Sequence, residues 1–192
     1  MTNLVWTFLA LLAGIAGGLG VTAWSVDSPP NFGVVEAGAW ITRPKVGSTE
    51  ADPYSRALHS AQGTIPLGAS EGVELTAAVD SAGRRLTAEC AYRFHGPVPA
   101  SRYWTLTAYR HDGRLVGDGE RRSAFTSAEV VRNQSGNAEI WLAATPRPGN
   151  WIPLPPDGAI DLSLRLYDTQ FSSNARAIDA ASVPRLDRES CQ

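Results

Sequence analysis

The spacing of apolar and polar residues divides the chain into two parts. Residues 4–24 contain no charged side chain, and the first one along the chain is Asp27. A helix of this length, rising about 1.5 Å per residue, spans a hydrocarbon core of about 30 Å. The pattern therefore predicts an N-terminal transmembrane helix within residues 1–25, in contact with the lipid bilayer.

A cleaved secretory signal is the alternative interpretation, because Val21, Thr22 and Ala23 resemble a small-residue cleavage site. Signals begin with basic residues and have an apolar run of roughly 7–15 residues, and this segment fits neither feature. We expect an uncleaved signal-anchor with its N-terminus in the cytoplasm. The rest of the chain is exported under either interpretation.

Small residues recur on one face of this helix. Ala10, Gly14 and Gly18 follow the small-xxx-small pattern of closely packed membrane helices. A homo-oligomer held by this face is one expectation. The alternative is that glycine and alanine are simply frequent in membrane spans of this composition.

The pattern after the apolar helix predicts a connecting segment followed by a single helix. Residues 26–48 contain adjacent prolines and no helical period, which predicts a tether with one short strand at 38–42. Asp52 is a good N-cap, a proline occupies the first helical position, and Gly63 ends the helix. Residues 49–192 are then the exported domain.

Beyond Gly63 the apolar residues recur at every second position, the period of strands with one buried face. Segments 73–80 and 86–94 flank the turn Asp-Ser-Ala-Gly and are predicted to form a hairpin. Further strands are predicted within 102–109, through 140–142 and through 160–166, with a hairpin turn at Asp112 and Gly113 and another turn at 133–136.

At least six strands and one short helix predict a mainly β fold, an antiparallel β-sandwich or jelly-roll-like domain. The tail is expected to form a short helix at 175–181. Residues 148–156 (PGNWIPLPP) are predicted to be a stiff loop crossing one end of the sandwich, because proline cannot donate to a sheet ladder. Trp151 and Ile152 would cap the core there, and Asn150 would bond local backbone.

The chain has two cysteines, Cys90 on the inward face of a predicted strand and Cys191 near the C-terminus. An even pair in an exported chain predicts a disulfide that ties the tail to the sheet. The alternative is a buried thiol at Cys90 and a free thiol at Cys191.

Composition and charge narrow the functional classes. The formal net charge is −2 and the isoelectric point is near 5.9, so the chain lacks the basic face that nucleic-acid binding requires. Lys45 is the only lysine, and this arginine bias with frequent Ala, Gly and Pro suggests GC-rich bacterial coding. We therefore expect a single-pass protein of the bacterial inner membrane with its C-terminal domain in the periplasm.

Motifs for chemistry are scarce. His59, His95 and His111 have no metal-ligand spacing, and neither a Gly-x-Ser-x-Gly elbow nor a phosphate-binding glycine loop occurs. We expect no metal, no cofactor and no catalytic residue. The alternative is a carbohydrate-active hydrolase with paired carboxylates on one sheet face, drawn from Glu71, Glu74, Asp161 and Asp168.

Large aromatic rings and arginines are the remaining candidates for recognition. Strand alternation places Trp104 toward the core and Tyr103 and Tyr109 on the opposite face. Such outward rings predict a surface for a glycan or an envelope protein, unless another element covers them. The candidate surface residues are Trp40, Arg43, Arg102, Tyr103, Tyr109, Trp141, Trp151, Arg165 and Tyr167.

Two stretches together resemble a known family. Residues 102–115 (RYWTLTAYRHDGRL) and 149–169 (GNWIP…LSLRLYDT) are similar to the bacterial family named domain of unknown function 1214. The segments DPYSRALHSAQGTIPLGASEGVEL and CAYRFHGPVP fit it as well, so the resemblance covers roughly 40–191. A proline that the family leads us to expect near position 170 is absent here.

The resemblance implies a β-rich, jelly-roll-like domain. Larger members of the family carry a second domain upstream, so this chain looks like a short, anchored branch. The family implies no reaction, cofactor or catalytic residue. The expected function is therefore a non-catalytic binding or structural domain at the cell envelope, with the hydrolase as the alternative.

Overall fold

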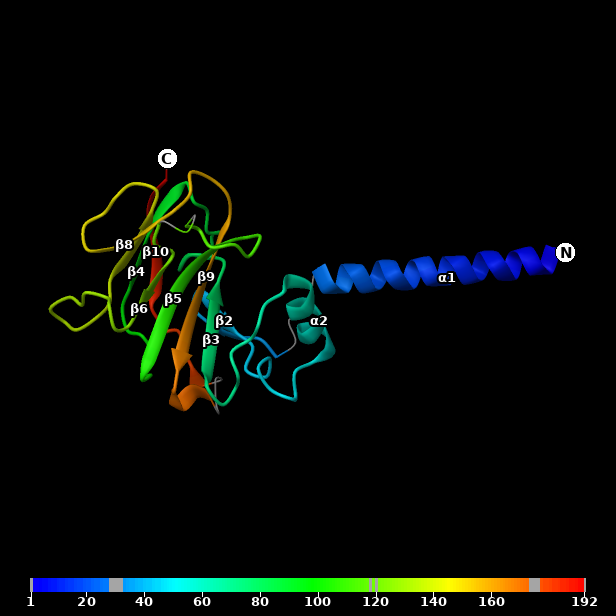
Figure 1. The fold of residues 1–192 in the computed structure, drawn as a ribbon, viewed down its shortest axis with the longest axis horizontal. Helices are drawn as coiled ribbons and strands as arrows, with labels where there is room; N and C mark the ends of the chain where they lie inside the picture. Colours follow the sequence, from blue (N-terminus) through cyan, green and yellow to red (C-terminus); the bar gives the residue numbers. More distant parts are fainter. Residues whose placement is uncertain (1, 28–32, 118, 120, 173–176, 192) are drawn as a thin grey trace.

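The computed structural model describes residues 2–27, 33–117, 119, 121–172 and 177–191. Helix α1 (Thr2–Asp27) extends away from a β-rich body, and α2 (Pro53–Gln62) lies between them (Figure 1). Within the described residues, α1 is the one helix long and apolar enough to cross a membrane, over Asn3–Ser25. A signal sequence would meet the same criterion. The faces of Gly14 and Gly18 are open, and the predicted homo-oligomer stays a prediction.

The described strands form two sheets. The large sheet has the order β1-β2-β3-β9-β5-β6, and the small sheet has the order β10-β4-β7-β8. The large sheet contains β1 (Val35–Ala37), β2 (Trp40–Thr42), β3 (Gly72–Ala77), β9 (Ile160–Tyr167), β5 (Tyr103–Arg110) and β6 (Ala124–Thr126). The small sheet contains β10 (Arg185–Cys191), β4 (Cys90–His95), β7 (Ile140–Ala143) and β8 (Asn150–Pro153).

The two sheets enclose the hydrophobic core between them. Phe94 of the small sheet contacts two rings of the large sheet, with ring centroids 6.2 Å from Trp40 and 6.4 Å from Trp104. The predicted mainly β fold with an N-terminal apolar helix is confirmed. The prediction of Trp40 as a surface residue is wrong: its ring is fully buried, and its Nε1 donates to the carbonyl of Pro184 at 2.7 Å.

The predicted hairpin of 73–80 with 86–94 is also wrong. β3 and β4 belong to different sheets. Next to the turn, an isolated bridge joins Val79 to Arg85, and the backbone N–H of Leu86 donates to the carbonyl of Ala78. The turn forms as expected, but both edges of β3 are occupied by β2 and β9. The chain beyond the turn therefore crosses to the small sheet, where β4 pairs with β7 and β10.

The proline-rich segment 148–156 contains a strand, which the sequence analysis did not predict. β8 pairs in parallel with β7 at the edge of the small sheet, so the sandwich is not wholly antiparallel. Ile152 is fully buried as expected, and Trp151 is half-buried with its Nε1 donating to the carbonyl of Ala143. Asn150 does not bond local backbone.

Asn150 instead joins three segments of the chain. Its Oδ1 accepts from the backbone N–H of Val131 at 2.8 Å, and its Nδ2 donates to the carbonyls of Val131 and Glu139, both at 2.7 Å. The side chain is buried, so these partners replace the water it would otherwise bind. The asparagine therefore fixes the edge strand against the preceding turn.

Helix α2 has the predicted signals at both ends. Asp52 accepts from the backbone N–H of Ser55, and Gly63 adopts a left-handed conformation with φ of 62°. His59 of the helix and the segments on either side of it line a cavity together with residues of β2 and β3. The helix predicted at 175–181 lies partly outside the described residues; in the described part, residues 180–181 form a turn.

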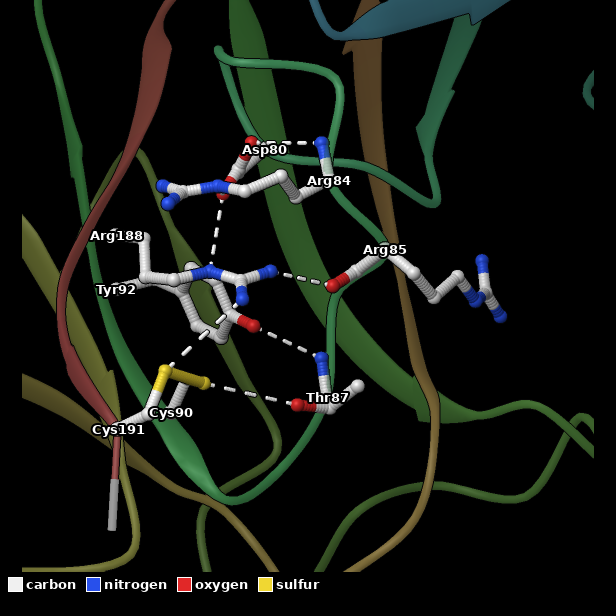
Figure 2. The surroundings of a disulfide bond; sticks show 8 residues. All are labelled: Asp80, Arg84, Arg85, Thr87, Cys90, Tyr92, Arg188 and Cys191. Carbon is white, nitrogen blue, oxygen red and sulfur yellow. Dashed lines mark hydrogen bonds and ion pairs between the residues drawn. A yellow bond between two sulfur atoms is a disulfide. The ribbon is translucent and has the colours of Figure 1, made fainter.

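The predicted disulfide is confirmed: Cys90 and Cys191 are bonded, and they also face each other in the register of β4 and β10 (Figure 2). The bond joins two residues that are 101 positions apart in the sequence. The disulfide lies beside the largely buried side chain of Arg188. The guanidinium carbon of Arg188 lies over the ring of Tyr92, 5.4 Å from the ring centroid. The C-terminal strand is thus held by a covalent bond and by a buried cation.

Candidate functional site

The outer face of the large sheet carries most of the exposed aromatic rings that the sequence predicted to point outward. Tyr103 and Tyr167 face each other across β5 and β9, with ring centroids 5.9 Å apart and planes inclined by 48°. Tyr109 lies further along β5, on the same face. These rings are half-buried or exposed, and so can contact a ligand.

A fixed ion pair lies between the tyrosines. Glu74 on β3 faces Arg165 on β9, and Glu74 Oε1 accepts from Arg165 Nε at 3.1 Å and from the hydroxyl of Ser163 at 2.6 Å. Burial alone would lower the pKa of Arg165, but the adjacent Glu74 raises the pKa above its ordinary value. The guanidinium therefore stays charged, and its position is set by the sheet register.

A second polar cluster lies at the other end of this face. Asp161 accepts from Arg85 Nη1 at 2.8 Å and contacts His111 Nδ1 at 3.0 Å. Asp161 opposes Tyr109 in the sheet register. The face thus carries an aromatic pair at one end, an ion pair in the middle and a charged cluster at the far end.

The carboxylates proposed for catalysis do not converge. Glu74 pairs with Arg165 and Ser163, whereas Asp161 pairs with Arg85 and contacts His111, so the two carboxylates have separate partners. Glu71 and Asp168 are neighbours through the bond from Asp168 N to Glu71 O at 2.9 Å, but Asp168 is exposed and ion-paired with Arg102.

The predicted recognition residues are divided among several places. Arg102 lies at the tyrosine end of the outer face, because its partner Asp168 follows Tyr167 directly. Trp141 and Trp151 are neighbours in the register of β7 and β8, on the small sheet, where Arg93 and Arg147 lie over the Trp141 ring. Trp40 is in the core and Arg43 lies at a cavity.

This cavity was not predicted by the sequence analysis. It has a volume of about 80 Å³ and lies where the segment around α2 meets β2 and β3. Arg43, His59 and Glu74 are among its lining residues. Arg43 and Glu74 are 31 positions apart in the sequence, and the three residues lie on a loop, a helix and a strand, so no local motif identifies them. In the described part of the chain, no group of three or more His, Cys, Asp or Glu side chains is arranged to hold a metal ion.

Comparisons with known proteins agree with the fold. The family model described as protein of unknown function (DUF1214) matches residues 71–171. The VPA0106 protein from Vibrio parahaemolyticus superposes with a TM-score of 0.57 at 18% identity, covering 73% of this chain and 36% of that one, which shows a shared fold.

A putative uncharacterized protein from Burkholderia cenocepacia is also similar, at 24% identity and a TM-score of 0.45, covering 67% of this chain and 33% of that one. This chain therefore spans about a third of the length of the solved structures it matches. No curated protein matches the sequence.

Proposed function

The chain belongs to the family of proteins of unknown function DUF1214, and we propose that it is a membrane-tethered glycan-binding protein of the bacterial envelope. Its binding surface is the outer face of the large sheet. The observation that carries this proposal is the Tyr103–Tyr167 pair beside the fixed cation of Arg165.

Aromatic rings suit glycans because a sugar ring has apolar C–H faces that pack on a π surface. Tyr103 and Tyr167 supply two such surfaces side by side, and both carry a hydroxyl that can hydrogen-bond at the rim. The pair comes from adjacent strands, so its spacing is set by the sheet rather than by flexible loops. A site on rigid elements loses little conformational entropy on binding.

The polar residues between the rings can form hydrogen bonds with the hydroxyl groups at the edge of a sugar ring. Arg165 is held by Glu74, so its remaining N–H groups are oriented before the ligand arrives. Thr105 and Thr107 lie on the same face of β5 and add hydroxyl groups. This mixture of rings, hydroxyls and one fixed cation favours an uncharged or anionic glycan over a cationic ligand.

The proposal is for binding and not for hydrolysis. No described contact joins the carboxyl groups of Glu74 and Asp161 as the pair that a glycosidase needs. Each of these carboxylates is also engaged by cations, Glu74 by Arg165 and Asp161 by Arg85.

Glycan binding is expected to depend on the tyrosine pair. In the variant Y103A/Y167A of the full chain in detergent micelles, binding on a glycan array falls by about tenfold or more, because two stacking surfaces are lost. The matched variant Y103F/Y167F keeps both rings and should bind nearly as well as the original chain. Failure of the original chain to bind any glycan, or equal binding by Y103A/Y167A, would overturn the proposal.

The tether is tested separately. We propose that α1 remains attached as a signal-anchor in the inner membrane, with the β-rich part in the periplasm, because Asn3–Ser25 is apolar and fully exposed. In a bacterial host the full-length protein should stay in membranes after carbonate extraction, and a C-terminal alkaline phosphatase fusion should be active. A shortened product in the soluble periplasmic fraction would show that the segment is a cleaved signal.

A further inference from the structure

The cavity beside α2 has walls from four parts of the chain. β2 and the loop after it contribute Ile41 and Arg43, α2 contributes His59, the segment before β3 contributes Leu67, and β3 contributes Glu74. The site is therefore formed only when α2 and its flanking segments pack on the edge of the large sheet.

Two glycines show that these walls fit closely. A Cβ added at Gly47 would lie 1.8 Å from the carbonyl oxygen of Leu67, and one at Gly72 would lie 2.0 Å from that of Leu166. The backbone of Ala69 also donates to the carbonyl of Gly47 at 3.1 Å. Backbone segments in such close contact cannot shift independently, so the cavity is a built feature of the fold.

The cavity combines an apolar lining with polar groups that have spare hydrogen-bonding capacity. Among the described residues, no hydrogen bond or ion pair satisfies the half-buried guanidinium of Arg43. Glu74 uses Oε1 for Arg165 and Ser163, and no described residue donates to its Oε2. Half-buried polar groups of this kind are commonly satisfied by a ligand or by water.

His59 lines the same cavity and interacts electrostatically with both Arg43 and Glu74. Its Nδ1 contacts the hydroxyl of Thr64 at 2.6 Å, which leaves Nε2 for another partner. Burial lowers the pKa of His59 below its ordinary value, while Glu74 raises it and Arg43 lowers it further. The imidazole is therefore neutral near pH 7, and Arg43 is the cation among these three side chains at that pH.

We propose that this cavity binds a small carboxylic acid that also carries a hydrogen-bond donor, such as an α-amino or α-hydroxy acid. The carboxylate of the ligand pairs with Arg43, and its ammonium or hydroxyl group donates to Glu74 Oε2. The apolar side chains of Ile41 and Leu67 accommodate a short hydrocarbon group. The cavity adjoins the glycan-binding face and shares Glu74 with it, because Oε1 of this residue holds Arg165 on that face while Oε2 serves the cavity.

The volume of the cavity limits the size of this ligand. About 80 Å³ is several times the roughly 10–15 Å³ that one water needs in a cavity, so a small organic molecule can enter. Alanine and lactate are therefore suitable probes of this cavity.

The test measures binding to the full chain in detergent micelles by isothermal titration calorimetry. Alanine and lactate are the probes, with alaninamide as the analogue that lacks the carboxylate and acetate as the one that lacks the donor. We expect alanine or lactate to bind, alaninamide not to bind, and acetate to bind more weakly. Alanyl-alanine then distinguishes a free amino acid from the carboxyl end of a peptide.

Two variants assign the interaction to residues. R43Q should weaken alanine binding by about tenfold or more, the loss expected for one charge-assisted pair, and E74Q should remove the preference for alanine over acetate. R114Q removes an equal charge from an exposed turn and should bind as the original chain does.

Equal binding of alanine and alaninamide by the original chain, or no binding of either acid, overturns the proposal. Retention of full affinity in R43Q overturns it as well. If R43Q does not fold, the comparison of alanine with alaninamide on the original chain still tests whether the cavity requires a carboxylate.

Discussion

Replacement of Asp80 by alanine is expected to lower the free energy of unfolding by about 3–5 kcal/mol, the cost of breaking a buried ion pair from one side. Asp80 is 1% exposed, and its Oδ2 lies 3.0 Å from Arg188 Nε, whose side chain is also largely buried. The variant D80A leaves this guanidinium without its counter-charge. Urea titration of the full chain in micelles, followed by tryptophan fluorescence, measures the change.

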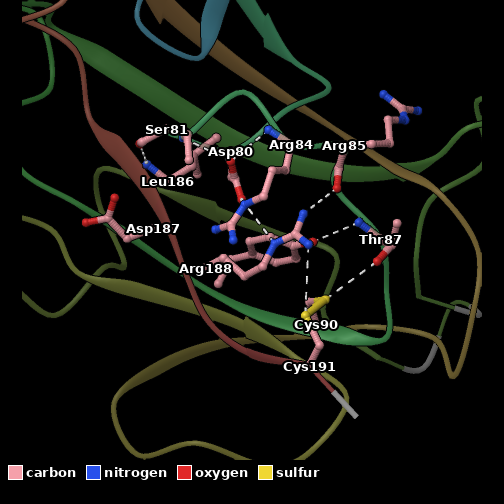
Figure 3. A network of polar contacts seen from close by, with 12 residues as sticks. Asp80, Ser81, Arg84, Arg85, Thr87, Cys90, Leu186, Asp187, Arg188 and Cys191 are labelled. Carbon is pink, nitrogen blue, oxygen red and sulfur yellow. Dashed lines mark hydrogen bonds and ion pairs between the residues drawn. A yellow bond between two sulfur atoms is a disulfide. The ribbon is translucent and has the colours of Figure 1, made fainter.

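Asp80 also holds the turn that precedes the crossing to the small sheet. Its Oδ1 accepts from the backbone N–H groups of Ala82 and Arg84, at 2.9 and 3.0 Å. Figure 3 shows that the next residue, Ser81, exchanges hydrogen bonds with Leu186 at the start of β10. D80A therefore releases the turn and weakens its attachment to the C-terminal strand.

The matched control is D112A. Asp112 also caps a turn, by accepting from the backbone N–H of Arg114, but it is exposed. We expect a loss of about 1 kcal/mol or less for D112A. If D80A costs no more than D112A, the buried pair with Arg188 is not an important source of stability.

The pH dependence follows from the same contacts. Burial alone would raise the pKa of Asp80, but hydrogen bonds from the backbone of Arg84 and Ala82 and the ion pair with Arg84 together lower the pKa below its ordinary value of 3.8. A carboxyl group whose pKa is lower in the folded state stabilises the fold above its unfolded pKa. This contribution is lost as the pH falls from about 4 through the folded pKa, and D80A should flatten the acid side of the stability profile.

Loss of the Cys90–Cys191 disulfide is expected to lower the free energy of unfolding by about 2–4 kcal/mol. The bond closes a loop with a sequence separation of 101 residues, so its absence enlarges the unfolded ensemble. Cys191 is exposed, so a reductant can reach the bond. The measurement is a urea titration of C90S/C191S beside the original chain, each with and without reductant.

The reductant is the internal control for this prediction. It should lower the stability of the original chain to that of C90S/C191S and leave the variant unchanged. An original chain that is equally stable with and without reductant, while alkylation shows both thiols free, would contradict the prediction.

The disulfide and Asp80 are coupled through Arg188. The guanidinium of Arg188 forms the ion pair with Asp80, and its Nη2 donates to the carbonyl of Arg85 at 2.6 Å. Its Nη1 contacts Cys191 Sγ at 3.9 Å (Figure 2). Residues that share a partner do not contribute independently to stability. The combined variant D80A/C90S/C191S should therefore lose less than the sum of the two separate losses.

Local signals in the sequence predicted several elements correctly. Asp52 and Gly63 mark the ends of α2 because caps act within one helical turn. Alternation over 160–166 predicted β9 and its buried face, since successive side chains on a strand point to opposite sides. Two cysteines in a chain that the sequence predicts to be exported left one internal pairing, and that pairing is present.

The candidate site was predictable only in part. Parity identified Tyr103, Tyr109, Arg165 and Tyr167 as outward residues, and they share one face because β5 and β9 are neighbours. Trp40 was misassigned because its strand is too short for alternation to distinguish its two sides, and its burial depends on distant residues such as Phe94 and Pro184. The cavity at Arg43, His59 and Glu74 had no sequence signal.

The apolar helix, the caps, the strand faces and the cysteine pair follow from the amino-acid sequence, because each depends on residues close in the chain or on simple counting. The partner of each strand, the three contacts of Asn150, the Asp80–Arg188 pair and the cavity beside α2 required the folded structure. Backbone hydrogen bonds are alike for any pair of strands, so pairing is chosen by packing between distant residues. For that reason β3 and β4, adjacent in the sequence, lie in different sheets.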